Sequence, residues 1–310
     1  MENLSIVVPC YNEEKVIEIF YNKLMETIQR ISSKYDYEII FIDDGSQDET
    51  FSKMKAIRQN NEKVKIISFS RNFGKEAGIH AGLSNSTGEY TVVMDADMQH
   101  PPEILLDMLK YIEEGYDTVA TRRINRKGEP AFKSFCARMF YKVINNFMEV
   151  KLEEGSQDFR MMKRNVVDAI LSLDEYNRFS KGIFNWVGFK CKYIEVENAE
   201  RIAGKTKWSF SALWKYAIEG ITSFTTAPLK IAIIIGIFAF IVSTIFAFTI
   251  IIQTLVMGKD VPGYASTIVS VLFMGAIQLL SIGILSEYIS KMYMEIKDRP
   301  KYIIRDKIEK

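Results

Sequence analysis

The chain has 310 residues, of which 48% are hydrophobic, so it is long enough for two domains and has the composition of a globular protein. Its formal net charge is +1, which leaves any argument about partners to the local distribution of charge. Its three cysteines, Cys10, Cys136 and Cys191, have no CxxC spacing and the chain has two histidines, which argues against a Cys/His zinc site. We expect reduced cysteines in a cytosolic domain.

The first 120 residues alternate short β-branched runs with helical patterns. Apolar residues recur at helical spacing between the first two runs, at Val16, Ile19, Phe20, Leu24, Ile28 and Ile31. This alternation predicts an α/β fold with a mostly parallel sheet that is covered by helices on both faces. Strands are expected over residues 4–8, 37–42, 64–69, 90–94 and 117–121.

Four polar clusters follow the first four strands, at the point where each strand ends. They read "PCYNEE", "DDGSQDET", "SRNFGKE" and "DADMQ". Each cluster alone is ordinary loop chemistry. Ligands of open α/β sheets, however, bind at the carboxyl ends of the strands, so four such clusters predict a ligand site at this edge.

The last cluster places two carboxylates, Asp95 and Asp97, after an apolar strand with no Lys or Arg beside them in the sequence. Because neighbouring carboxylates repel each other, a positive partner is expected. Mg²⁺ commonly binds one or two carboxylates together with substrate phosphates. Arg71 and Lys75 can neutralise further phosphate oxygens, and Asp43 or Asp44 can accept hydrogen bonds from a base or ribose. The site therefore predicts a nucleoside diphosphate ligand, and since GxxxxGK[ST] is absent, a P-loop NTPase is disfavoured.

Residues 231–258 and 261–286 contain no charged side chain, and each run is longer than the roughly 20 residues that cross a bilayer. They predict two transmembrane helices, at about 231–256 and 264–286, rather than two buried core helices. Positive residues flank the pair, while the short connection "GKDVPG" has no net charge, which predicts that both ends of the hairpin are cytoplasmic. These flanking residues are Lys215, Lys230, Lys291, Lys297, Arg299 and Lys301.

Four segments, "VVPCYNEE", "IDDGSQDET", "SRNFGKEAGIHAGL" and "MDADMQHPPE", resemble in this order the family 2 inverting glycosyltransferases of GT-A fold. With "GSQDFRMM", "RIAGKTKWSF" and the terminal hairpin, the resemblance narrows to polyprenyl-phosphate glycosyltransferases, the group of dolichol-phosphate mannose synthase and bactoprenol glucosyltransferase. It covers essentially the whole chain.

The resemblance implies a role for individual residues. Asp95 and Asp97 would bind Mg²⁺ or Mn²⁺, with Gln99 as an accessory and Asp97 counted among the catalytic residues. Asp158 in "GSQDFRMM" matches a candidate general base, and the alternative is an orienting role through a basic neighbour such as Arg160. The nucleotide sugar would be held by Pro9, Tyr11, Glu13, Asp43, Asp44, Arg71, Lys75 and Asp95.

The second half carries two apolar stripes at helical spacing. The stripe over 132–147 is expected to pack on the sheet, and the stripe over 210–224 is expected to lie at the membrane surface as an interfacial helix. Between them, Arg201, Lys205 and Lys207 are expected to hold the phosphate of a lipid acceptor, with help from Arg122; a solvated charged loop is the alternative. The expected domains are thus 1–208 (catalytic), 209–228 (interfacial), 229–290 (transmembrane) and 291–310 (a basic cytosolic tail).

The expected activity is transfer of a hexose to a polyprenyl phosphate with inversion. The segment "SRNFGKEAGIHAGL" resembles bacterial enzymes that use UDP-glucose or UDP-N-acetylglucosamine as the donor. A composition rich in Lys, Ile and Asn also suggests a bacterium, which makes undecaprenyl phosphate the expected acceptor and the bacterial inner membrane the expected location, with the catalytic domain and both termini cytoplasmic. Two alternatives are a processive polysaccharide synthase and a non-catalytic nucleotide-sugar-binding protein. No nucleic-acid partner is expected, and self-association is left open.

Overall fold

The computed structural model describes residues 2–123, 145, 153, 155–196, 222, 225–257 and 263–309. The chain divides into two compact units. The first comprises Met1–Ala217 together with Arg299–Lys310, and the second comprises Ile218–Asp298. The second unit is therefore an insertion in the sequence of the first, and the chain returns to the first unit for its last residues.

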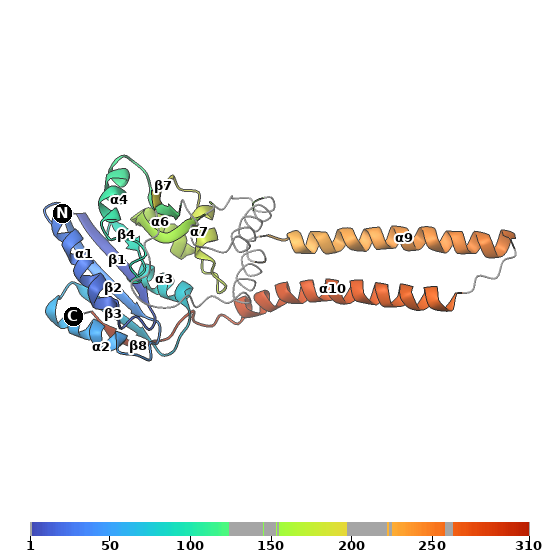
Figure 1. Ribbon diagram of the computed structural model, residues 1–310, viewed down its shortest axis with the longest axis horizontal. Coiled ribbons are helices and arrows are strands. Elements are labelled where there is room, and N and C mark those ends of the chain that lie inside the picture. The colour runs from blue at the N-terminus through green and yellow to red at the C-terminus, as the bar shows by residue number, and fades with distance from the viewer. Residues whose placement is uncertain are drawn as a thin grey trace. The chain divides into compact units, whose positions relative to one another are not determined.

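The first unit is built on an eight-stranded sheet with the strand order β7-β5-β6-β4-β1-β2-β3-β8 (Figure 1). β1, β2, β3 and β4 are parallel neighbours, and β6 runs antiparallel to both β4 and β5. The five strands expected from the sequence are confirmed. The strands are β1 (Glu2–Cys10), β2 (Tyr35–Asp43), β3 (Val64–Phe69), β4 (Tyr90–Val93), β5 (Thr118–Arg123), β6 (Ser156–Lys163), β7 (Cys191–Val196) and β8 (Ile304–Ile308).

Helices cover both faces of the sheet, because successive residues of the buried strands point in opposite directions. Leu4, Ile6 and Val8 of β1 share a core with α1 (Ile17–Ile31), α2 (Thr50–Asn60) and α4 (Ile104–Glu113). Val7 faces α3 (Lys75–Ser84), which comes so close that a Cβ on Gly82 would lie 2.0 Å from the Val7 Cγ1 atom. α6 (Arg164–Ser172) and α7 (Ser180–Trp186) also belong to the described part of this unit.

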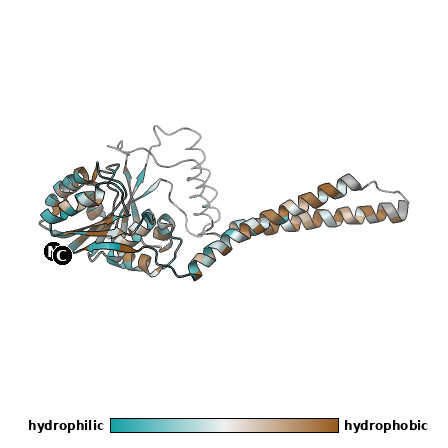
Figure 2. Ribbon diagram, turned by 90° about the horizontal axis from the view of Figure 1, so that it is seen from below, coloured by the Kyte–Doolittle hydropathy of each residue, from teal (hydrophilic) through white to brown (hydrophobic). Residues whose placement is uncertain are grey.

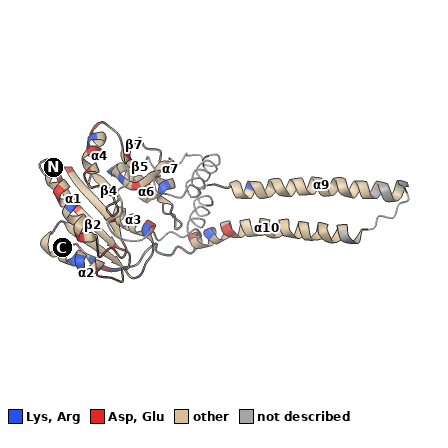
Figure 3. Cartoon of the chain, in the orientation of Figure 1, with Lys and Arg blue, Asp and Glu red and all other residues tan. Residues whose placement is uncertain are grey.

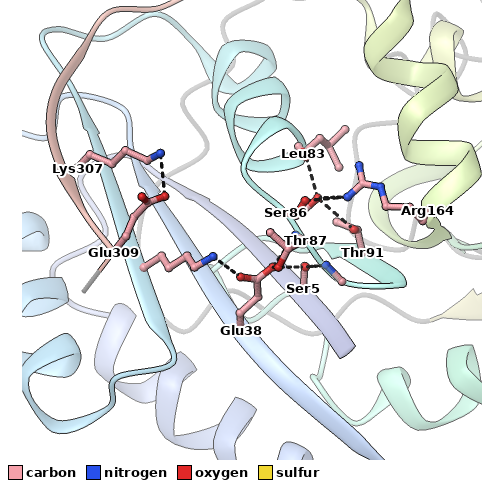
Figure 4. A network of polar contacts seen from close by, with 11 residues as sticks. Ser5, Glu38, Leu83, Ser86, Thr87, Thr91, Arg164, Lys307 and Glu309 are labelled. Atoms are coloured by element: carbon pink, nitrogen blue, oxygen red, sulfur yellow. Dashed lines mark hydrogen bonds and ion pairs between the residues drawn. The ribbon is translucent and has the colours of Figure 1, made fainter. Parts of the chain in front are cut away.

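A buried polar network lies at the amino ends of the central strands, where Glu38 is 6% exposed (Figure 4). Its Oε1 atom accepts hydrogen bonds from the Ser5 hydroxyl (2.5 Å) and the Thr87 amide (2.7 Å). The Lys65 ammonium lies 2.6 Å from Oε2. These partners lower the pKa of Glu38 even though burial by itself raises it. Figure 4 also shows an exposed pair, Lys307 with Glu309.

The second unit is a hairpin of two long helices, α9 (Ala227–Met257) and α10 (Tyr264–Ile296), which pack along each other. Both are long and apolar enough to cross a membrane (Figure 2), and at most 6% of the most apolar stretch of either helix is buried. Charged side chains are spread over the first unit but are sparse along the hairpin (Figure 3).

The structure refines several expected boundaries. Both helices extend beyond the expected spans, and residues 291–296 of the expected tail continue α10. Residues Ile304–Ile308 form β8, the edge strand beside β3. The stripes over 132–147 and 210–224 lie outside the described residues, apart from Asn145 and Thr222.

Candidate active site

The four polar clusters meet at one edge of the sheet, as expected for parallel strands. Pro9 and Cys10 pair with Ile42 and Asp43, so the ends of β1 and β2 lie side by side. Pro9 is half-buried and packs against α3, where a Cβ on Gly78 would lie 3.2 Å from the Pro9 Cβ.

An ammonium group joins two carboxylates at this edge. The Lys75 Nζ atom, at the start of α3, lies 2.7 Å from the Asp95 Oδ1 atom and 2.7 Å from the Asp158 Oδ2 atom. Asp95 follows β4 and Asp158 belongs to β6, so three elements contribute one residue each. The positive partner that the sequence around Asp95 lacks is thus supplied by a lysine 20 residues upstream.

These contacts alter the acidity of both partners. Burial raises the pKa of Asp158, but the charge of Lys75, with Lys181 and Arg160 nearby, outweighs it and holds that pKa well below its ordinary range. Burial by itself lowers the pKa of Lys75, and Asp158 and Asp95 reverse this and raise it. Lys75 is therefore a permanent cation, and Asp158 is a permanent carboxylate while Lys75 stays in place.

Asp158 forms its ion pair with Lys75 and not with Arg160. Within the described part of the chain, no ion pair joins Asp158 to Arg160. Arg160 is 1% exposed, and its guanidinium lies over the Phe184 ring at 3.7 Å. Its Nη2 atom reaches the Ser156 hydroxyl and the Gln157 carbonyl at 3.5 Å.

The loop that carries Asp97 is held by its own backbone. The Gln99 amide donates to the Asp97 Oδ1 atom at 3.1 Å, and Met98 between them has φ of 60°, a conformation uncommon for a residue with a side chain. Asp95 and Asp97 therefore stand on one short, constrained turn.

Asp43 and Asp44 anchor loops. The Asp43 carboxylate accepts hydrogen bonds from the Ser46 amide (3.0 Å) and the Ser68 hydroxyl (2.7 Å). The Asp44 carboxylate accepts from the Phe73 and Gly74 amides (2.6 and 2.9 Å), and burial raises its pKa in spite of these bonds. Asp44 thereby fixes the loop from which Lys75 projects.

Gly45 allows this loop to come close, because it has φ of 69° and a Cβ there would lie 2.5 Å from the Arg71 carbonyl carbon. Arg71 is exposed, its guanidinium lies over the Phe73 ring at 3.9 Å, and it forms no ion pair with a described carboxylate. Tyr11 and Glu13 are half-buried, and the Glu13 amide donates to the Thr50 hydroxyl at 2.8 Å.

Sequence reasoning missed Glu76, which follows Lys75 on α3. Its Oε2 atom accepts from the Ser180 amide at 3.0 Å and from the Ser180 hydroxyl. Glu76 thus ties α3 to α7, which carries Lys181 and Phe184. Its place beside Lys75 in "FGKEAG" was the available signal, but its partner lies 104 residues away.

Of the four residues expected to bind the acceptor phosphate, the structure describes Arg122. Arg122, at the end of β5, is paired with Glu153 (3.5 Å) and Glu195 (2.5 Å). Arg201, Lys205 and Lys207 lie outside the described residues. The predicted lipid-phosphate site therefore stays a prediction.

The residues present fit a divalent cation that takes most of its ligands from a substrate. Among the described residues, no group of three or more His, Cys, Asp or Glu side chains forms a complete metal site. Asp95 and Asp97 offer two carboxylates from one turn, the donor set by which Mg²⁺ or Mn²⁺ binds together with phosphate oxygens.

Comparison with known proteins places this geometry in a family. Residues 5–171 match the model of glycosyl transferase family 2, and residues 227–292 match that of the GtrB C-terminal hairpin. The chain belongs to glycosyl transferase family 2. The expected GT-A fold, the resemblance to polyprenyl-phosphate glycosyltransferases and the assignment as a glycosyltransferase are confirmed.

Two relatives match over nearly the whole chain. Putative glycosyltransferase CsbB of Bacillus subtilis is 46% identical over 303 residues, which cover 98% of this chain and 91% of the relative. The bactoprenol glucosyl transferase of Shigella phage SfV is 42% identical over 307 residues, or 99% of each chain. Among solved structures, the mannosyltransferase PcManGT of Pyrobaculum calidifontis, in complex with GDP-Man and Mn²⁺, is 15% identical with a TM-score of 0.46, covering 94% of this chain and 84% of that chain.

Proposed function

We propose that this chain transfers glucose from UDP-glucose to a polyprenyl phosphate, with undecaprenyl phosphate as the expected acceptor, and inverts the anomeric carbon. The observation that carries the proposal is the similarity along almost the entire chain to the phage bactoprenol glucosyl transferase, hairpin included. A processive synthase would need more membrane-spanning segments than this hairpin provides, and a binding protein could dispense with the cation and carboxylates at the sheet edge.

The donor diphosphate is proposed to lie between Asp95, Asp97 and the start of α3. A divalent cation held by Asp95 and Asp97 would act as a Lewis acid for the departing nucleoside diphosphate. Lys75 holds a fixed positive charge 2.7 Å from Asp95 and stabilises the negative charge that develops on the leaving group. Arg71, exposed on the neighbouring loop, is proposed to bind a further phosphate oxygen.

The acceptor needs little help from a base. A phosphate monoester has its second pKa at about 6, so most of it is a dianion at neutral pH. Asp158 has a pKa held well below its ordinary range, which makes it a poor proton acceptor near neutral pH. We therefore assign Asp158 the positioning of Lys75, to which it is bound at 2.7 Å.

The lipid phosphate is proposed to be bound by Arg201, Lys205 and Lys207 with Arg122. Arginine and lysine form charge-assisted bonds to phosphate. In the structure Arg122 is paired with Glu153 and Glu195. Substituting Arg122 by a neutral residue would therefore also leave these two carboxylates without their cation. The hairpin is proposed to cross the bacterial inner membrane, with the catalytic unit in the cytoplasm where nucleotide sugars are made.

The test is lipid-dependent release of the nucleotide by the purified full chain, using UDP-glucose, UDP-N-acetylglucosamine and GDP-mannose in turn. We expect release of UDP from UDP-glucose only when undecaprenyl phosphate and a divalent cation are both present. Asp95→Asn should abolish it. Release that is independent of the lipid, or faster release from another donor, would contradict the proposal.

A further inference from the structure

β8, the strand that follows the hairpin, contacts residues next to the proposed donor site. β8 pairs antiparallel with the outer edge of β3, with Asp306 opposite Ser68 and Ile308 opposite Ile66. The Ser70 amide donates to the Ile303 carbonyl at 2.9 Å. The Tyr302 ring stacks on Phe69 at 4.8 Å between centroids. The segment after the hairpin is thus bound to the strand that leads into the Arg71 loop (Figure 1).

A chain of hydrogen bonds runs inward from this strand. The Arg305 Nη2 atom donates to the Ser68 hydroxyl oxygen at 3.0 Å, and the Ser68 hydroxyl donates to the Asp43 Oδ2 atom at 2.7 Å. Ser68 and Asp43 are each 0% exposed, whereas the Arg305 side chain is 47% exposed. The pairing of β3 with β8 shifts register between Ser68 and Phe69, next to this contact. Such bulges redirect side chains.

The direction of the bonds matters because a serine hydroxyl has a single proton. When Arg305 donates to its oxygen, that proton is directed to Asp43. With the Ser46 amide on Oδ1, the Asp43 carboxylate is then held from both sides. Neutralising Arg305 would remove one of the two hydrogen bonds that fix the Ser68 hydroxyl, and with it the positive charge that polarises this hydroxyl toward the Asp43 carboxylate.

We propose that Arg305 is a positioning residue of the donor site, which acts through Ser68 to hold the buried carboxylate of Asp43 and, through the Ser46 amide, the loop that follows β2. This rests on the proposed function, in which UDP-glucose binds at the edge of the sheet that this loop borders. The strand that follows the membrane hairpin is therefore part of the nucleotide-binding apparatus.

The experiment is calorimetric titration of the full-length protein in detergent with UDP and Mn²⁺. Arg305→Gln should raise the Kd for UDP roughly three- to tenfold, the effect of one hydrogen bond. Ser68→Ala should raise it by a similar factor. The double variant should bind no more weakly than the weaker single variant, because both changes break one relay. The KM for undecaprenyl phosphate should stay the same in all three.

Lys307→Gln is the matched control, since Lys307 lies two residues away on β8 and its ammonium is paired with Glu309 instead of with Ser68. It should leave the Kd unchanged. An unchanged Kd in Arg305→Gln, additive effects in the double variant, or an equal loss in Lys307→Gln would overturn the inference. If the wild-type protein does not bind UDP, the proposed donor is wrong and the inference fails with it. If the wild type binds UDP and Arg305→Gln has the same Kd, the inference alone is overturned. Ser68→Ala keeps the test decisive if Arg305→Gln loosens β8.

Discussion

Lys75 pairs with two carboxylates: that of Asp95, which would also bind the metal, and that of Asp158, which it holds in place. The two contacts have the same length, 2.7 Å, and the Lys75 side chain keeps 43% of its surface exposed toward solvent. A cation in this place can turn toward substrate phosphate without leaving the site. The exposed ammonium is the group we expect a donor diphosphate to meet.

Lys75→Met should lower kcat by about 100-fold or more, the usual cost of losing a group that stabilises charge in the transition state. The pKa of Asp158 should rise, because burial raises it and Lys75 carries the nearby positive charge that lowers it most. Because Asp158 is assigned only the positioning of Lys75, its protonation at low pH should leave the residual activity of this variant unchanged. Lys53→Met, which removes a surface pair with Glu18, is the control and should keep full activity. A full kcat in Lys75→Met would remove the residue from the site.

The carboxylate pair predicts dependence on a metal. Asp95→Asn and Asp97→Asn should each abolish most turnover while the melting temperature stays within a degree or so of the wild type, because neither side chain belongs to the apolar core. Asp107→Asn, on the exposed side of α4, should change neither quantity. Turnover that persists undiminished in excess EDTA would show that Asp95 and Asp97 do not bind an essential cation.

At the scale of elements, the pattern of apolar residues predicted the parallel strands and the helices between them, because these strands are continuous buried runs. β6, β7 and β8 are harder to predict. β6 begins with the polar residues of "SQDF", and β8 has three consecutive charged residues between two isoleucines, within a charged tail. That the four polar clusters lie together could be predicted from the parallel order of the strands alone. The contact of Lys75 with Asp158 could not be predicted, because it depends on β6 running antiparallel beside β4.

The Glu38 network, which joins β1, β2 and the turn before β4, is expected to stabilise the fold without affecting the chemistry. Glu38→Ala leaves buried donors of Ser5 and Thr87 without an acceptor, so it should cost about 1–3 kcal/mol. Because the folded pKa of Glu38 is lowered, its contribution is present above the ordinary pKa of a glutamate and is lost as the pH falls through the folded value.

The loss in melting temperature should therefore be larger at about pH 7 than at about pH 3. Glu309→Ala, which breaks the exposed pair with Lys307, is the matched control and should change stability by less than about 1 kcal/mol. An equal loss in Glu38→Ala at both pH values would contradict the assigned charge state.

At the scale of the whole molecule, the hairpin is inserted between two parts of one folded unit. Because the chain leaves that unit before α9 and rejoins it after α10, we expect both ends of a membrane-spanning hairpin to lie on the same side of the membrane as the unit. This supports the orientation expected from the positive residues, although those charges were only a statistical signal.

A cysteine introduced at Gly258, after the native cysteines are replaced by alanine, should react with an impermeant thiol reagent in intact cells. A cysteine introduced at Lys297, after α10, should react only once the membrane is permeabilised. The reverse pattern would place the catalytic unit outside the cytoplasm, away from nucleotide sugars.

In the proposed reaction, an oxygen of the lipid phosphate attacks the anomeric carbon of glucose directly, from the face opposite to the departing UDP. The measurement is the NMR spectrum of the lipid product that the purified protein makes from UDP-glucose and undecaprenyl phosphate, read at the anomeric proton. We predict a single glucose joined through C1 to the phosphate in the β configuration, the inverse of the α-linked donor. An α-linked product, or glucose attached anywhere other than the lipid phosphate, would contradict it.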